Sequence, residues 1–96
     1  MPLSYVEFIS LKYYDKQHFL YNIRHASNYY LNTLGAYKTK TTILRRYTIV
    51  RGDLTNGEYV IVRINNQDIN RYPILINNNG IRRVTYKTIY NTLTET

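Results

Sequence analysis

The chain has 96 residues, a formal net charge of +7 and no cysteine. A chain of this length can bury one modest hydrophobic core, which predicts a single domain over residues 1–96. The lack of cysteine excludes disulfides, thiolate metal sites and cysteine nucleophiles.

The positive charge is concentrated in the second part of the chain. Residues 1–34 carry a formal net charge of +1 and residues 35–96 carry +6. An excess of this size favours a polyanionic partner, which makes nucleic acid the first expectation and an acidic protein surface the second.

No apolar run approaches the ~20 residues that are needed to span a bilayer. The N-terminus also lacks the basic and then apolar pattern of a secretory signal. We therefore expect a soluble, intracellular protein, in the cytoplasm of the producing or host cell, with no membrane partner. The 12 tyrosines and the many Asn and Ile residues are typical of an AT-rich gene, which favours a virus or a mobile element as the source.

The first half of the chain predicts a strand and then a helix. Residues 4–11 alternate imperfectly, with Val6 and Phe8 on one face, and we expect a strand there. Asp15 then stands at an N-cap position, apolar residues recur at helical spacing, and Gly35 follows as a C-terminal stop. These signals predict an amphipathic helix over residues 16–34. Its polar face is interpreted as solvated and consists of Gln17, Asn22, Arg24, Asn28 and Asn32.

The second half predicts an antiparallel meander of three or four strands. Residues 36–42 are a basic connector, or begin the first strand early. Residues 43–50 and 58–64 form a hairpin closed by Asn56-Gly57, with Val60, Val62 and Ile64 facing the core. Pro73 cannot donate a ladder hydrogen bond, so the strand at 69–76 is expected to be an edge or to bulge. A turn at 77–80 leads to the last strand, at 81–84.

The C-terminal segment fits two structures. Thr85 is placed to cap a short helix with Ile89 and Leu93 on one side, while the Thr, Tyr and Ile content suits a strand equally well. The short helix is favoured. The fold class is therefore α+β, with one helix covering one sheet face and the other face, carrying Tyr47, Tyr59 and Arg63, open to solvent or a partner.

Basic residues and tyrosines are interleaved along the predicted sheet. Arg and Lys neutralise phosphates and exposed tyrosine rings stack on unpaired bases, so this mixture predicts nucleic-acid binding. The candidate binding residues are Lys38, Lys40, Arg45, Arg46, Tyr47, Tyr59, Arg63, Arg71, Arg82, Arg83 and Lys87.

Three alternatives remain open. The same Arg and Tyr residues suit an accessory protein that binds and modulates a protein partner, because these residue types dominate interface hot spots. The expected edge strand at 69–76 would allow self-association into a homodimer. The expected order of strand, helix and three strands, with the basic balance, resembles the small ribosome-dependent toxins of bacterial toxin–antitoxin pairs, which implies a metal-independent ribonuclease. No motif matches that family residue by residue.

Catalysis is the minority interpretation. His18 and His25 lie seven residues apart, about 10 Å along a helix axis, which does not suit one shared metal ion. The six acidic residues fall in different predicted elements, and no phosphate loop, nucleophile motif or metal-ligand spacing is present. The sequence predicts no cofactor, no metal and no catalytic residue.

Overall fold

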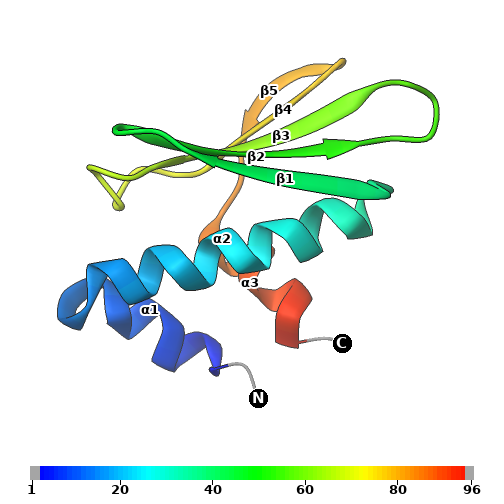
Figure 1. Ribbon diagram of the computed structural model, residues 1–96. Helices are drawn as coiled ribbons and strands as arrows, with labels where there is room; N and C mark the ends of the chain where they lie inside the picture. The colour runs from blue at the N-terminus through cyan, green and yellow to red at the C-terminus, as the bar shows by residue number, and fades with distance from the viewer. Residues whose placement is uncertain (1–2, 95–96) are drawn as a thin grey trace.

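A computed structural model describes residues 3–94 of the chain and shows an α+β fold (Figure 1). Two helices precede a sheet of five strands, and a third helix follows it. The elements are α1 (Tyr5–Tyr14), α2 (Lys16–Thr33), β1 (Lys38–Ile43), β2 (Tyr47–Asp53), β3 (Tyr59–Asn65), β4 (Ile74–Asn77), β5 (Gly80–Arg83) and α3 (Tyr86–Thr94).

The sheet is an antiparallel meander with the strand order β1-β2-β3-β4-β5, which confirms the predicted meander but has five strands where three or four were predicted. All three helices lie on one side of it, and α2 runs directly beneath the sheet (Figure 1). The face turned toward the helices carries the core side chains of β3, namely Val60, Val62 and Ile64, as predicted. No described element lies over the other face of the sheet.

Residues 5–14 form a helix, so the strand predicted at 4–11 is wrong. Ser4 and Glu7 make a reciprocal capping box, in which each side chain accepts a hydrogen bond from the other residue's backbone N–H. The hydrogen bond from the Ser4 backbone N–H and, as a smaller effect, the one with the Ser4 side chain lower the pKa of the Glu7 carboxyl group. This cap starts the helix. Ser-x-x-Glu is a signal for a helix N-terminus, and it outweighs the imperfect alternation of residues 4–11.

The main helix agrees with the prediction at both ends. The Asp15 side chain accepts a hydrogen bond from the backbone N–H of His18 and caps α2. At the other end Gly35 takes a φ of +103°, and the backbone N–H groups of Gly35 and Ala36 donate to the carbonyl oxygens of Asn32 and Leu31. This is the Schellman arrangement that glycine permits at a helix end.

Two strand boundaries differ from the prediction. The segment 43–50 is not one strand, because Leu44–Arg46 turn the chain between β1 and β2. Of the two structures expected for residues 36–42, the early start of a strand is the one observed, since β1 spans Lys38–Ile43. The segment 69–76 is not an edge strand either: only Ile74–Asn77 pairs, between β3 and β5, and Pro73 lies just before it. The free edges belong to β1 and β5, so the basis for self-association through 69–76 is lost.

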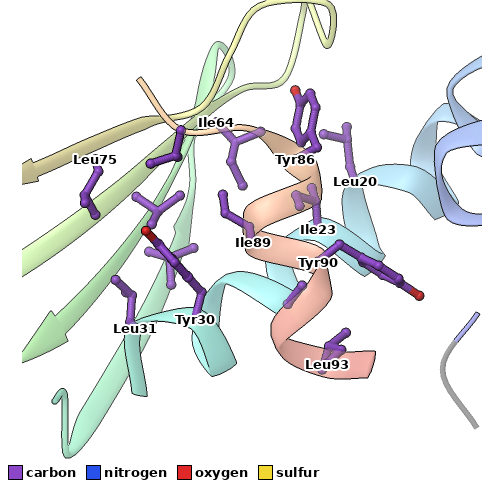
Figure 2. Close-up of a cluster of buried hydrophobic side chains, with 14 of the residues drawn as sticks. Leu20, Ile23, Tyr30, Leu31, Ile64, Leu75, Tyr86, Ile89, Tyr90 and Leu93 are labelled. Atoms are coloured by element: carbon purple, nitrogen blue, oxygen red, sulfur yellow. The ribbon is translucent and has the colours of Figure 1, made fainter. Parts of the chain in front are cut away.

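The core is packed between the sheet, α2 and α3. Figure 2 shows Ile64 and Leu75 of the sheet facing Ile23 of α2 and Ile89 of α3. The predicted C-terminal helix is confirmed, with Thr85 accepting a hydrogen bond from the Thr88 backbone and with Ile89 and Leu93 buried.

The N-terminal helix joins this core through an aromatic stack. Phe8 is fully buried between Tyr90, 4.0 Å away, and Phe19, 4.8 Å away, as measured between ring centroids. The Tyr90 hydroxyl donates to the Leu3 carbonyl oxygen at 2.7 Å. These contacts fix α1 against both of the other helices.

Arg24 was predicted to lie on a solvated helix face, and this prediction is wrong. Its guanidinium donates to Thr48 Oγ1 at 2.9 Å and to Asn66 Oδ1 at 3.3 Å, and burial lowers its pKa. Asn66 in turn donates through its side chain to the Leu44 carbonyl oxygen. The network ties α2 to the β1–β2 turn and to the end of β3.

Candidate nucleic-acid interface

The uncovered face of the sheet, called the open face below, is defined by the strand register. Residues directly opposite each other on paired antiparallel strands share a face. The register places Arg63 of β3 beside Ile49 of β2 on one side and beside Ile74 of β4 on the other. The open face therefore carries Lys38, Lys40, Thr42, Tyr47, Ile49, Arg51, Asp53, Tyr59, Ile61, Arg63, Asn65, Ile74, Ile76, Ile81 and Arg83.

A row of isoleucines crosses the open face from the middle strand to one edge. Ile61, Ile76 and Ile81 lie side by side on β3, β4 and β5. Ile81 is 73 % exposed, which is unusual for a residue of this size. Arg51 of β2 lies beside Ile61 at the inner end of this row, and the row ends at Ile81 on the free edge of β5.

Arginines and tyrosines of the open face are paired. The Arg51 guanidinium lies 4.4 Å from the centroid of the Tyr59 ring, and that of Arg63 lies 4.8 Å from the Tyr47 ring. Such a pair holds the guanidinium in place without using its nitrogen atoms. Among the described residues no carboxylate pairs with Arg63, whereas Arg51 Nε also donates to Asp53 Oδ1 at 3.1 Å. Tyr59 is the first residue of β3, and Tyr47 lies opposite Asn65, the last residue of β3. The two pairs therefore lie toward opposite ends of a strand that is roughly 20 Å long.

One end of the open face is hollowed. The hollow has a volume of about 810 Å³. Its lining comes from the β1–β2 turn, the start of β2, the end of β3, the β3–β4 loop and the strands β4 and β5. The lining residues are Arg46, Tyr47, Arg63, Asn65, Gln67, Asp68, Arg71, Tyr72, Ile74 and Arg83. We call it the basic hollow.

The basic hollow carries a formal excess of three positive charges, because four arginines face one carboxylate. That carboxylate, Asp68, pairs with Arg71 at 3.3 Å, and the exposure of both side chains makes the pair weak. Within residues 3–94 no carboxylate lies within ion-pair distance of Arg46, Arg63 or Arg83. The hollow is thus an anion-attracting site whose positive charge is not neutralised by the protein.

The structure brings together some of the candidate residues and separates others. Arg46, Tyr47, Arg63, Arg71 and Arg83 line the basic hollow. Lys38, Lys40 and Tyr59 lie elsewhere on the open face.

The remaining candidates lie off this surface. Arg45 is in the β1–β2 turn outside the hollow, and Lys87 is on α3. Arg82 pairs with Leu75, a core residue, and therefore belongs to the helix-side face.

Two features of the open face were missed at the sequence level. Arg51 was absent from the candidates because Arg51-Gly52-Asp53 was placed in a loop, whereas these residues continue β2. The row of isoleucines was missed because it exists only in the register across three strands. Continued alternation of side chains along 47–53 indicates that Arg51 belongs to the strand. No local sequence signal indicates the row of isoleucines.

The histidines take no part in the open face. His18 and His25 both lie on α2, on the helix side of the sheet, and the His25 ring packs edge-on against Tyr29. Among the described residues no group of His, Asp and Glu is arranged to hold a metal ion.

Comparisons with protein-family models, with curated proteins and with solved structures found no significant match. Within residues 3–94 no helix combines the length and the apolar character needed to cross a membrane.

Proposed function

We propose that this protein is a small basic binding protein for single-stranded nucleic acid, and that the strand lies on the open face. The observation that carries the proposal is the gathering of Arg–Tyr pairs and unpaired arginines on the one sheet face that no helix covers. Arg and Lys would contact phosphates, and the tyrosine rings would stack on bases.

The shape of the surface favours single strands over duplex DNA. No helix is available to enter the major groove, because all three helices of the described residues pack against the core side of the sheet (Figure 1). A sheet face with exposed aromatic rings instead suits unpaired bases that can splay onto it. Tyr59 and Tyr72 are both about half exposed and available for this contact.

The direct test is fluorescence anisotropy with labelled single-stranded DNA, single-stranded RNA and duplex DNA over a series of salt concentrations. A single-strand contact to Z phosphates gives a slope of about −0.7Z in a plot of log K against log salt. The double variant K38Q/K40Q removes two lysines from the open face. It should make the slope less negative by about 1.4, if each lysine contacts one phosphate.

The matched control is the double variant K16Q/K87Q, which removes the same charge from α2 and α3. Its slope should remain that of the unmodified protein. If both double variants made the slope less negative by the same amount, net charge alone would attract the nucleic acid and the open face would not be the binding surface.

A protein partner is the second candidate, and the isoleucine row favours it. Exposed apolar side chains beside basic ones suit a protein interface, and Ile81 is 73 % exposed on the edge strand β5. An acidic protein would complement the basic side chains. Loss of partner binding in I81S, with unchanged affinity for single-stranded oligonucleotides, would support this function.

A further inference from the structure

The basic hollow concentrates more positive charge than contact with a continuous strand requires. Each internal phosphodiester carries one negative charge, and a strand lying across a sheet distributes these charges along its length. The hollow instead presents an excess of three positive charges within one concavity of about 810 Å³. This volume lies within the range of pockets that hold whole small ligands.

A terminal phosphate monoester matches this site better than an internal phosphate does. It carries close to two negative charges at neutral pH and offers three strong acceptor oxygens. Guanidinium groups bind such oxygens through pairs of parallel hydrogen bonds. Arg46, Arg63 and Arg83 line the same hollow from the β1–β2 turn, from β3 and from β5.

The surroundings of the hollow would also position a nucleotide. Arg63 is held against Tyr47 at 4.8 Å and Arg83 against Tyr72 at 6.0 Å, as measured to the ring centroids. Tyr72 is 53 % exposed and can stack on the terminal base. The hollow lies at one end of the open face, where the β3–β4 loop contributes four of its lining residues, Gln67, Asp68, Arg71 and Tyr72.

We propose that the basic hollow binds the phosphate monoester at one end of a single strand, so that the protein recognises phosphorylated strand ends. This inference rests on the proposed function of the open face. A free mononucleotide offers the same phosphate chemistry, and the experiment below separates the two ligands.

The test uses one single-stranded oligonucleotide sequence with an internal label, made with a 5′-phosphate, with a 3′-phosphate or with hydroxyl groups at both ends. One of the two phosphorylated forms should bind roughly 10- to 100-fold more tightly than the hydroxyl form, as expected for added charge-assisted hydrogen bonds. The gain should fall below about pH 6, where the phosphate dianion takes up a proton and becomes a monoanion.

Two pairs of variants locate the effect. R46Q and R83Q should each lose most of the gain, because both arginines line the hollow. R45Q and R82Q should keep it, because Arg45 lies outside the hollow and Arg82 lies on the opposite sheet face. All four side chains are exposed, and thermal unfolding of each variant checks that the fold is intact.

The outcomes are distinct. Equal binding of the three oligonucleotides overturns the end-recognition proposal and leaves the proposed function standing. Failure of all three to bind overturns both. A nucleoside 5′-monophosphate that binds as tightly as the phosphorylated oligonucleotide overturns recognition of a strand end in favour of a free nucleotide.

Discussion

Gly52 is the point of closest approach between the sheet and the end of the main helix. Gly52 lies in β2 and faces the helix layer. A Cβ atom added there would stand 2.7 Å from the Cβ of Ala36 and 3.2 Å from the Cβ of Leu31. Neither neighbour can swing aside, because a Cβ atom is fixed to its backbone. We therefore expect G52A to push α2 and the sheet apart.

The expected cost follows from this geometry. Overpacking of a well-packed core lowers the free energy of unfolding by about 1–3 kcal/mol. For a chain of this size that loss lowers Tm by roughly 4–8 °C per kcal/mol. Chemical denaturation and a thermal melt monitored by circular dichroism would measure both quantities. The flanking Arg51 and Asp53 side chains lie on the open face, so oligonucleotide binding by the folded fraction should not change.

The double variant G52A/A36G tests the cause. Removing the Ala36 methyl group eliminates the 2.7 Å contact, so the cost of G52A should be smaller in the A36G background than in the unmodified protein. Contacting residues typically show coupling of about 0.5–3 kcal/mol. A G52A variant as stable as the unmodified protein, or a cost that A36G leaves unchanged, would refute this reasoning.

Three further predictions concern the helix layer and the open face. F8A removes the ring stacked between Tyr90 and Phe19, and urea unfolding should show a loss of about 3–5 kcal/mol, with a smaller loss in F8L. Burial, and then the charge of Asp68, raises the pKa of Tyr86, whose hydroxyl donates to the Arg71 carbonyl oxygen. The folded state thus keeps a proton that the unfolded chain releases above about pH 10, so stability should fall as pH rises beyond that value. The fall should be shallower in Y86F, and an identical pH profile would contradict the assignment. Y59L should weaken single-strand binding by about 1–3 kcal/mol in anisotropy titrations while duplex binding stays unchanged; equal weakening of both would argue against base stacking.

Local sequence signals were sufficient for part of the fold. Asp15 and Gly35 marked both ends of α2, and Thr85 marked the start of α3. Asn56-Gly57 indicated a turn, and Gly57 adopts a φ of +87° there. In each case one residue type satisfies a specific backbone requirement, and such requirements are visible in sequence.

Other boundaries depended on tertiary contacts. Leu44, Arg45 and Arg46 form a turn although none of them is a turn former, and the Asn66 side chain holds this turn from the far end of β3. Arg24 looked solvated because its partners, Thr48 and Asn66, are remote in sequence. Interactions of this kind cannot be read from local pattern.

The residue types of the candidate site were predictable from the sequence, but their positions in space were not. Interleaved arginines and tyrosines indicated a binding sheet face, and Arg63 and Tyr47 do share the open face. Alternation along a strand places Arg82 and Arg83 on opposite faces, but only the register of β5 on β4 shows that Arg83 lies on the open face. The basic hollow depends in addition on the β3–β4 loop, which has no regular pattern.

The adjacent arginines of β5 allow the most direct test of the central claim, that the open face binds single-stranded nucleic acid. R83Q and R82Q remove the same charge one residue apart, from the open face and from the helix-side face respectively. The measurement is the affinity of each variant, at a fixed salt concentration, for one single-stranded oligonucleotide with hydroxyl groups at both ends. We expect R83Q to bind roughly 10-fold more weakly than the unmodified protein, as for the loss of one charge-assisted contact, and R82Q to bind almost as tightly. Equal affinities in the two variants would contradict the claim.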